Sequence, residues 1–466
     1  MRARLFIFFL LITFNSFAGK VVYVSSSLGS DNNSGLSANA PLKTIGHAYE
    51  LHKKNIELRL KCGDVFFETL RKWENCTITS YGKGQKPVLC GFKILKNTDA
   101  WFKKEDLWVL DLNKASDFGG FVDVIDKKLN NIGCIYDNVH DKMYGHQVES
   151  QNKLQNNGDW YITDVHNESK VTGETFRYLY FKYDGNPKTL GHLCFSVARN
   201  GVNGLRNCVL RNLTIMGFGQ HGISNPDGCQ IEDCNIDIIG GSILLDRQEW
   251  VRYGNGIEYW ITEHAASNSL VRNCLISRTF DTGSTIQGSS ETLNSPKNIS
   301  FENCRFYHCR QAFERYLQYA KPGVSYVNCH FRNNISYMAG DNGFDTPYEC
   351  DADLLSYEFQ DHSFDVSGNT FYGSSYYFGA KLPSGIHDNV VYIYRNQYLH
   401  NPHYNKSLTK IRANSENDIE EYRKRTGDNS TIVILDRGSN KDLSIRSSVL
   451  KKINYQRQNL NVNELQ

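Results

Sequence analysis

The sequence predicts an all-β chain folded as a right-handed parallel β-helix, a solenoid in which short strands stack coil upon coil. The first observation is a repeat, because short alternating strands recur around an Asn-Cys or Asp-Cys dipeptide. The second is composition, since 27 Tyr, 25 Phe and 37 Gly among 466 residues are typical of strands joined by frequent turns. The dipeptides are Asn207-Cys208, Asp233-Cys234, Asn273-Cys274, Asn303-Cys304 and Asn328-Cys329.

Each repeat alternates apolar and polar residues, so one face of every strand points inward and the other outward. One coil cannot bury its apolar face, but stacked coils form a continuous core. The Asn of each dipeptide is expected at a turn, where stacked copies bond one another as a ladder. A β-sandwich is the alternative, but sandwiches lack this recurrent turn. The copies span residues 209–215, 229–236, 270–276 and 299–306, with weaker copies at 324–331 and 364–371.

The charge balance argues against a nucleic-acid partner. The formal net charge is +2, and 22% charged with 40% hydrophobic residues indicates a globular protein without a basic face. The length exceeds that of one ordinary compact core, but a solenoid grows lengthwise without thickening its core.

The N-terminus is typical of a secretory signal. Arg2 and Arg4 precede an apolar stretch at residues 5–14, and small residues follow, with cleavage expected after Ala18 or Gly19. An uncleaved anchor is the alternative, although the apolar stretch is short for a bilayer. We therefore expect a secreted, periplasmic or cell-surface protein with no membrane span after cleavage.

The 13 cysteines are an odd number, so at least one lacks a partner in a monomer. An exported protein is expected to use disulfides. Here, however, many cysteines recur in one turn context, which indicates small apolar side chains that stack on their own copies. We therefore expect mostly buried free thiols. The sequence has no CxxC pair and no Cys/His spacing typical of zinc.

Residues 23–27, 29–35 and 40–45 resemble the opening of secreted pectate-lyase-like β-helix proteins, in which a strand and a short helix cap the solenoid. The resemblance places that helix at residues 45–54 and the first coils at 62–67 and 78–84. It covers about residues 20 to 400. Residues 158–164 and 178–181 read as a β-hairpin region, and they resemble the small β-rich insertion of some β-helix glycoside hydrolases.

These features divide the chain into five parts. A helix near residues 418–425 and a strand at 431–435 are expected in the last part. The parts are a signal segment at residues 1–18, a cap with the first coils at 19–120, a β-rich insertion at 121–191, the main helix at 192–400 and a C-terminal extension at 401–466.

Aligning the coils by their turns brings Glu258, Thr285 and Glu314 into one outward column. Adjacent coils lie about 4.8 Å apart, so the two glutamates are expected at about 9 to 10 Å, near the upper limit for an inverting glycosidase. Asp281 lies on the coil between them and gives a closer pair, about 5 Å, suited to a retaining mechanism. The sequence does not choose between the two.

The same stretch is rich in groups that bind sugars. His221 is a further acid-base candidate. Aromatic faces come from Trp250, Tyr253, Tyr259, Trp260 and Tyr316, and cations for carboxylates or sulfates from Arg247, Arg252, Arg278 and Arg315. No cofactor is expected, although calcium can bind the acidic run of Asp341, Asp345, Asp351 and Asp353.

The leading hypothesis is a secreted carbohydrate-active enzyme that hydrolyses a polysaccharide or oligosaccharide, with Glu258, Asp281 and Glu314 as its carboxylates. The resemblance supports the fold more than the activity, since unrelated enzymes share this scaffold. Two alternatives stay open. One is a polysaccharide lyase that cleaves uronic-acid glycans by β-elimination. The other is a non-catalytic glycan-binding or surface structural protein.

Overall fold

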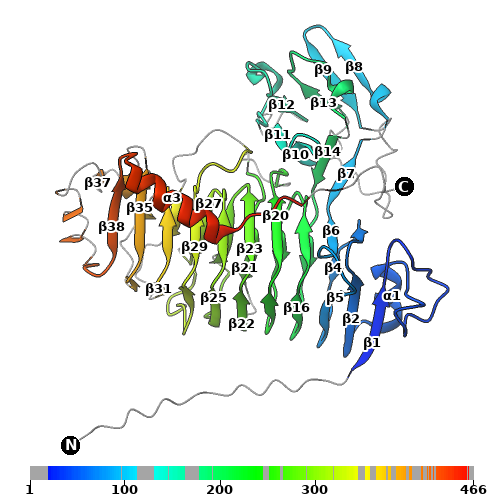
Figure 1. Cartoon of the computed structure of the whole chain (residues 1–466), viewed down its shortest axis with the longest axis horizontal. Coiled ribbons are helices and arrows are strands. Elements are labelled where there is room, and N and C mark those ends of the chain that lie inside the picture. The colour runs from blue at the N-terminus through cyan, green and yellow to red at the C-terminus, as the bar shows by residue number, and fades with distance from the viewer. Residues whose placement is uncertain are drawn as a thin grey trace, which may run out of the picture.

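The prediction of a right-handed parallel β-helix is confirmed by the computed structural model, in which three ten-stranded sheets run the length of a solenoid (Figure 1). Neighbouring strands of these sheets pair in parallel, except β36 and β37. The structure describes residues 19–95, 97–112, 131–144, 146–162, 178–191, 193–244, 251–262, 266–289, 291–317, 320–344, 352–356, 364–373, 376–378, 385–394, 398–400, 411–412, 417, 419–420, 423–424, 427–458 and 460.

Each coil contributes one strand to each of the three sheets. Sheet 1 contains β1 (Lys20–Val24), β2 (Ile56–Lys61), β5 (Thr77–Tyr81), β16 (Val209–Arg211), β19 (Gln230–Glu232), β22 (Ser267–Arg272), β25 (Lys297–Glu302), β28 (His330–Arg332), β31 (Asp365–Ser367) and β34 (Ile386–His387). Sheet 2 contains β3 (Val65–Phe66), β6 (Val88–Cys90), β17 (Thr214–Met216), β20 (Asn235–Ile239), β23 (Leu275–Thr279), β26 (Arg305–Tyr307), β29 (Ile335–Tyr337), β32 (Thr370–Tyr372), β35 (Val390–Tyr394) and β38 (Ile432–Asp436). Sheet 3 contains β4 (Leu70–Arg71), β15 (Val202–Asn203), β18 (Ile223–Ser224), β21 (Ile257–Ile261), β24 (Thr282–Gly288), β27 (Gln311–Tyr316), β30 (Ala352–Ser356), β33 (Tyr376–Phe378), β36 (Tyr398–His400) and β37 (Ile411–Arg412).

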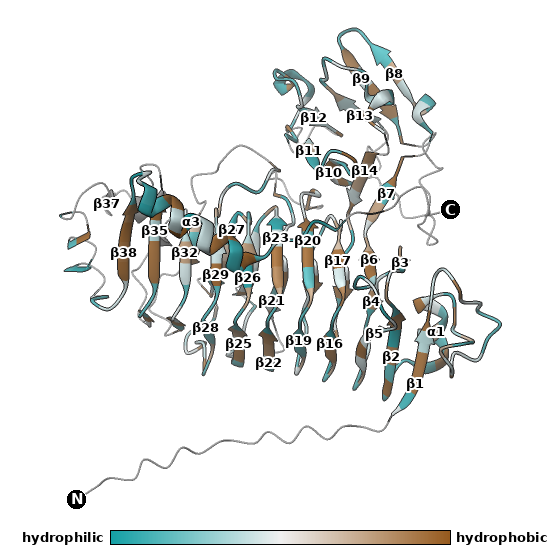
Figure 2. Ribbon diagram, in the orientation of Figure 1, coloured by the Kyte–Doolittle hydropathy of each residue, from teal (hydrophilic) through white to brown (hydrophobic). Residues whose placement is uncertain are grey.

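One cluster of buried apolar side chains fills the solenoid from Val22 in β1 to Ile393 in β35. Its members come from the inward positions of all three sheets, and the hydrophobic residues alternate with polar ones along the strands (Figure 2). Because each coil covers the next, the core is continuous along the long axis.

The Asn of each repeated dipeptide stands at a corner where the backbone is left-handed. Asn273 and Asn303, between sheets 1 and 2, have φ of 56° and 54°. Asn298, near the start of β25, and Asn328, before β28, have φ of 54° and 51°. Asn and Asp tolerate this region better than other residues with a side chain. The recurring dipeptide therefore encodes a backbone corner.

The cysteine after each corner points into the core. The Cys274 thiol reaches the Ile231 carbonyl of the preceding coil at 3.6 Å, and the Cys304 thiol reaches that of Val271 at 3.7 Å. Burial raises the pKa of the Cys274 thiol well above its ordinary value, so it behaves as an inert apolar group. All twelve cysteines within the described residues are buried and free, which confirms the prediction for them.

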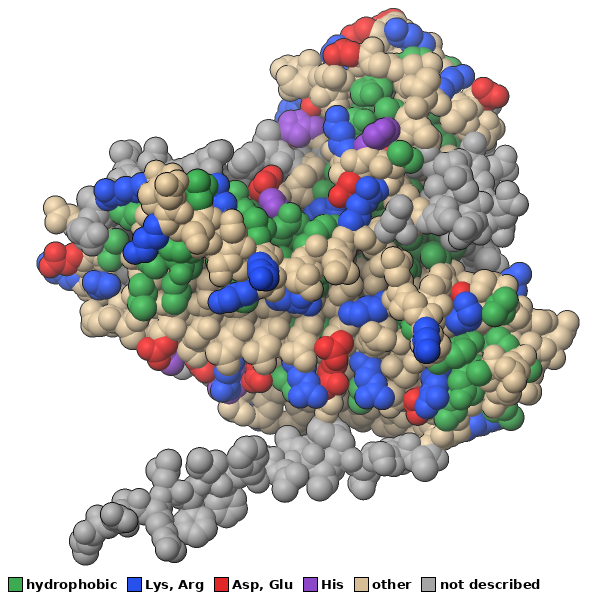
Figure 3. All heavy atoms as spheres, viewed as in Figure 1, with side chains coloured by type: hydrophobic (Ala, Val, Ile, Leu, Met, Phe, Trp, Pro, Cys, Tyr) green, Lys and Arg blue, Asp and Glu red, His purple; other side chains and the backbone are tan. Residues whose placement is uncertain are grey.

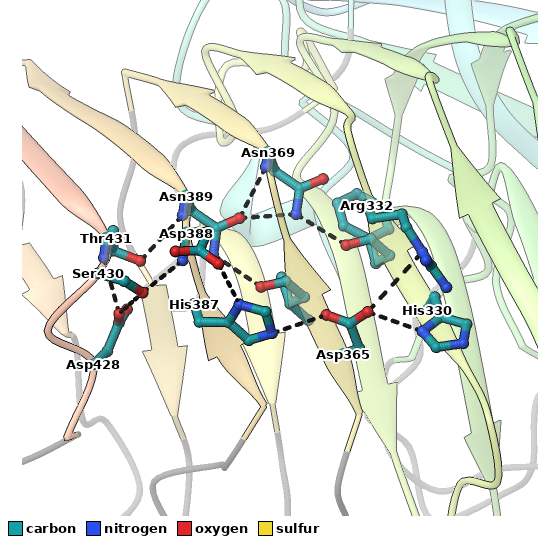
Figure 4. Close-up of polar contacts among 12 residues, drawn as sticks. His330, Arg332, Asp365, Asn369, His387, Asp388, Asn389, Asp428, Ser430 and Thr431 are labelled. Carbon is teal, nitrogen blue, oxygen red and sulfur yellow. Dashed lines mark hydrogen bonds and ion pairs between the residues drawn. The ribbon is translucent and has the colours of Figure 1, made fainter. Parts of the chain in front are cut away.

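The predicted asparagine ladder exists in two places rather than at every dipeptide. At the start of the sheet 1 strands, Asn328 donates to Asn298 and Asn298 to Asn268, each at 2.8 Å. At the corner between sheets 1 and 2, the residue with the left-handed backbone points outward. The residue after it forms the hydrogen-bonded ladder. Asn369 Oδ1 accepts the Asn334 amide at 2.9 Å. Asn389 Oδ1 accepts the Asn369 amide at 3.0 Å (Figure 4). Buried asparagines thus replace the cysteines at the C-terminal end.

The outward face of sheet 1 carries paired charges. Asp365 lies between His330 at 2.9 Å and His387 at 3.3 Å (Figure 4). Burial opposes ionisation of Asp365, but hydrogen bonds from Ser367 and His330 outweigh it and hold the pKa below its ordinary value. Such surface pairs contribute about 0–1 kcal/mol each.

The predicted cap is present at the N-terminal end. Strand β1 is the first strand of sheet 1, and helix α1 (Ile45–His52) lies beside it. The Thr44 hydroxyl accepts the His47 amide at 3.1 Å and so caps the helix. Ile45 and Ala48 are buried in the core. This cap covers an otherwise open end of the solenoid.

The β-rich insertion is larger than predicted. It leaves the solenoid after β6 and returns at β15, so it begins near β7 rather than at residue 121. The strands that follow β6 belong to the insertion, because they form antiparallel sheets with strands that come after residue 121. One sheet contains β11 (Lys142–Tyr144), β10 (Ile132–Asp137), β14 (Leu193–Val197) and β7 (Phe92–Ile94), and the other contains β12 (Trp160–Tyr161), β13 (Tyr178–Phe181), β9 (Leu107–Asp111) and β8 (Trp101–Lys104), with short 3-10 helices η1 (Thr98–Ala100), η4 (Gln151–Lys153) and η5 (Pro187–Thr189).

The C-terminal extension is part of the solenoid. The expected strand is β38, which pairs with β35, so the helical stack continues beyond residue 400. Helix α3 (Asn440–Ile453), not predicted from the sequence, packs Val449 and Ile453 on the outside of sheet 2 (Figure 1). Of the helix expected at residues 418–425, the described ones are helical: Ile419, Glu420, Arg423 and Lys424.

The last described residues reach the insertion. Leu460 is buried beside Phe92, and its carbonyl accepts the Asn138 side chain at 2.7 Å. The predicted signal segment at residues 1–18 lies outside the described residues. Within the described residues, no helix is both long and apolar enough to cross a membrane.

We expect Asn369→Leu to lower the free energy of unfolding by about 1–3 kcal/mol, because it leaves the buried Asn334 amide and Phe331 carbonyl without their partner. Urea-induced unfolding followed by circular dichroism measures the loss. Asn298→Gly is the matched control, since it removes two exposed ladder bonds, to Asn268 and from Asn328, and keeps the left-handed backbone accessible. An equal loss in both variants contradicts the buried ladder.

Candidate active site

The predicted carboxylate column lies on sheet 3. Glu258 in β21 pairs with Thr285 in β24, and Thr285 pairs with Glu314 in β27. The Thr285 hydroxyl donates to Glu314 at 3.2 Å. The register expected from the sequence is therefore confirmed, and the two glutamates are separated by one intervening coil.

Tight backbone packing precedes Glu258. A Cβ on Gly256 would lie 2.5 Å from the Gly283 carbonyl oxygen and 2.7 Å from the Ile276 side chain. Only glycine lets the corner between sheets 2 and 3 close this tightly. This tight corner places the Asn255 side chain beside the Glu258 carboxylate.

The Glu258 carboxylate is buried and surrounded by donors. Its Oε2 accepts the Ser224 hydroxyl at 3.1 Å and lies 3.3 Å from His221 Nε2. Its Oε1 accepts the Asn255 amide at 3.1 Å and that of Gln287 at 3.4 Å. Four donors, one from the same coil and three from the two neighbouring coils, converge on the two oxygens and fix the orientation of this carboxylate.

His221 is held in one tautomer. Its Nδ1 accepts the backbone N–H of Asn255 at 3.2 Å, so in the neutral ring the proton is on Nε2. That Nε2–H faces Glu258. The ring also meets Tyr253 edge to face, with centroids 5.3 Å apart. His221 therefore acts on Glu258 as a positioned donor.

Asp281 lies just before β24, next to the Glu258 coil, and its backbone amide donates to the Gly254 carbonyl at 3.2 Å. Burial raises the pKa of this carboxyl, and the charge of Glu258 raises it further, while Arg310 and His221 oppose the shift. Among the described residues the Asp281 side chain receives no hydrogen bond. The site thus combines a carboxyl whose pKa is raised with an oriented carboxylate.

A second outward column runs beside the first. Trp260, Gln287 and Tyr316 are paired across β21, β24 and β27, each two residues after its neighbour in the carboxylate column. The Trp260 ring is 36% exposed and Tyr316 is half-buried. These side chains form an aromatic and amide surface next to the carboxylates.

Tyr259 and Arg315, predicted to bind substrate, point inward and are not presented on the outer face of sheet 3. Tyr259 is fully buried in the core, where its ring meets Phe301 edge to face. Arg315 is 1% exposed and donates from Nε to Ser356 at 2.9 Å. The physical reason is strand alternation, since outward Glu258 and Glu314 place the following residue inward.

Arg252 and Arg278 are also not presented to the carboxylate column. The Arg252 side chain donates to the carbonyls of Gly241 and Gly133, which ties the insertion to the solenoid. Arg278, on sheet 2, bonds Asp237 through two nitrogens at 2.8 and 2.5 Å and Asp141 at 2.7 Å. Both arginines hold parts of the fold together.

Arg247 and Trp250 lie outside the described residues, as do Asp345 and Asp351. Of the remaining acidic run, Asp341 contacts His308, while Asp353 is buried in contact with Ser336. Within the described part of the chain, no three or more His, Cys, Asp or Glu side chains form a group that can hold a metal. Calcium binding therefore stays a prediction.

Sequence reasoning missed the partners of Glu258, namely Ser224, Asn255 and Gln287. The signal was available, because Ser224 and Asn255 occupy the same aligned segments as His221 and Glu258. Arg310 was also missed. It is buried with its guanidinium 4.2 Å from the Phe280 ring centroid, and its charge acts on Asp281.

No family model and no curated protein matches this chain. Among solved structures, it is similar to a GH136 lacto-N-biosidase from Eubacterium ramulus, at 13% identity and TM-score 0.37, over 89% of this chain and 68% of that one. It is also similar to XylC in complex with xylose, at 12% identity and TM-score 0.41, over 89% and 82%. A Pseudomonas phage phi297 tailspike, gp61, matches at 10% identity and TM-score 0.21, over 74% and 63%. The fold assignment rests on the sheet topology above.

We expect Arg278→Met to lower the free energy of unfolding by about 3–5 kcal/mol, because it leaves the buried Asp237 charge unpaired. Guanidinium-induced unfolding measures this. Arg206→Met, which breaks a more exposed pair with Asp227, is the control and should cost about 0–1 kcal/mol. A stable Arg278→Met protein that binds glycans less well would restore a substrate-binding role.

Proposed function

We propose that this protein is a carbohydrate-active enzyme that hydrolyses glycosidic bonds of a polysaccharide or oligosaccharide, with Asp281 and Glu258 as its catalytic pair. One observation carries the proposal: a carboxyl with a raised pKa stands beside an oriented carboxylate on one face of sheet 3. Glycoside hydrolysis requires such a pair with opposite protonation states.

Asp281 is the general acid. The scissile C–O bond breaks more easily when its oxygen receives a proton as it leaves the anomeric carbon. Burial and the neighbouring Glu258 charge favour the protonated form of Asp281. Arg310 then lies close enough to stabilise the carboxylate that remains after the proton has moved.

Glu258 is the partner carboxylate. It either takes a proton from the water that attacks the anomeric carbon or attacks that carbon itself. Both roles need a carboxylate held in one orientation, which Ser224, Asn255 and Gln287 supply. His221 is a positioning residue, because it acts on the substrate through Glu258.

The sugar lies along the second outward column. Trp260 and Tyr316 offer aromatic faces for pyranose stacking, and Gln287 lies between them. Glu314 lies two coils from Glu258 and bonds Thr285, so it suits a hydroxyl of a neighbouring sugar. The basic, apolar and small-residue order of the N-terminus supports export, to the cell surface, the periplasm or the medium.

We expect Glu258→Gln and Asp281→Asn each to lower kcat/KM by about 10²–10⁴, because each removes one half of the acid–base pair. Glu314→Gln should cost less than about tenfold, since it leaves that pair intact. Reducing-end release from a panel of plant, algal and host glycans measures the effect, with Glu232→Gln on sheet 1 as the control. Full activity in both the Glu258→Gln and the Asp281→Asn variant contradicts the assignment of the catalytic pair. An unsaturated product that absorbs ultraviolet light would show that the enzyme is a lyase.

We expect kcat/KM to fall as the pH rises through the raised pKa of Asp281, because the acid loses the proton that it must donate. In Asp281→Asn this alkaline limb should disappear. Aryl glycosides with an acidic phenol as leaving group need little protonation, so they should restore much of the lost rate in this variant. An unchanged alkaline limb in Asp281→Asn would assign the acid to another residue.

A further inference from the structure

Two adjoining cavities open where the insertion meets the loops of the solenoid, in the hollow between the two parts of the molecule (Figure 3). Their volumes are about 260 and 290 Å³. Both are lined by Met143 from the insertion and by Asp341 and Gly343 from the solenoid. The two parts therefore share one open junction.

Each cavity has a histidine with one nitrogen already engaged. In the first, His146 Nδ1 lies 2.7 Å from Asp159 Oδ1. In the second, His308 Nδ1 lies 2.7 Å from the Asp341 carbonyl oxygen. In both rings the structure therefore leaves Nε2 as the nitrogen for a ligand, and Nε2 can accept from a hydroxyl or, when protonated, donate to one.

Aromatic and polar groups complete the first cavity. Tyr144, Tyr183 and Phe344 line it together with Lys142 and Asn157. The Lys142 ammonium stands 4.6 Å from the Tyr144 ring centroid and meets no carboxylate among the described residues. Aromatic faces combined with amide, imidazole and ammonium groups are the surroundings that a pyranose ring requires, with stacking below and hydroxyl bonds at its edge.

Two residues that line the cavities, Asn342 and Phe344, contact the chain directly before Asp281. Asn342 donates to the carbonyls of Thr279 and Phe280 at 3.0 and 3.2 Å, and Phe344 packs against Phe280 with centroids 5.8 Å apart. Asp281 is the next residue. At Gly343, with φ of 80°, an added Cβ would meet Met143 at 2.6 Å, so insertion and solenoid are in close contact here.

We propose that this junction is a distal subsite, in which the insertion and the solenoid together bind one sugar unit of a glycan whose scissile bond lies at Asp281. The proposal rests on the proposed function for the position of that bond. It assigns the insertion a role in recognising chain length, since a short substrate occupies the carboxylate site alone.

The test is binding without turnover. In a Glu258→Gln background, calorimetry measures affinity for xylo-, gluco- and galacto-oligosaccharides from disaccharide to hexasaccharide. Adding Lys142→Ala and Asn157→Ala should weaken binding of the longest ligand about tenfold, the loss expected for two hydrogen bonds, and leave the disaccharide unchanged. Lys153→Ala is the control, because this insertion lysine pairs with Glu149 and does not line the cavities.

If the cavity variant and its parent bind ligands of every chain length with equal affinity, the subsite proposal is wrong. Loss at every length, disaccharide included, also overturns it, since the cavity would then belong to the carboxylate site. Failure of the proposed function has a different signature: a length-dependent loss in a protein that hydrolyses none of these glycans leaves a glycan-binding protein with this subsite. Absence of any binding by the parent overturns both proposals.

Discussion

The hydrogen bonding of one coil to the next is the constraint on which the rest of this structure depends. Parallel strands about 4.8 Å apart force each position of a coil to lie on its copy in the next coil. Left-handed corners at residues such as Asn273 and Asn303 keep the coils in phase. Residues then sort into columns, so that buried cysteines stack over several coils and buried asparagines take over where β29, β32 and β35 follow.

The same stacking builds the candidate site from separate coils. Glu258, Thr285 and Glu314 lie in one column because their strands share a register. His221 and Ser224 contact Glu258 from the preceding coil. Asp281 stands outside the regular column, where the corner into sheet 3 brings it near Glu258. This mixture of a regular column and an irregular corner lets two carboxyl groups lie close together in different surroundings, and the pKa of Asp281 is raised as a result.

The outer face of a solenoid alone is open. In this protein the insertion and the C-terminal segment border that face. Arg252 binds the insertion through the Gly133 carbonyl, and Arg278 joins Asp237 of the solenoid to Asp141 of the insertion. Tyr455, after helix α3, donates to the same Asp237 at 3.2 Å. These buried polar links fix the insertion and the C-terminal segment to the solenoid around the junction cavities.

The sequence by itself determined the fold, the coil register, the burial of the cysteines and the column of Glu258 and Glu314. It did so because stacking repeats local patterns, and local patterns are visible in a linear chain. Alternation even placed Tyr259 and Arg315 inward, although their chemistry suggested sugar binding. Only the tertiary structure decided the partners of Arg278, the early start of the insertion at β7 and the raised pKa of Asp281. These depend on burial and on contacts between distant segments, and no spacing along the chain records them.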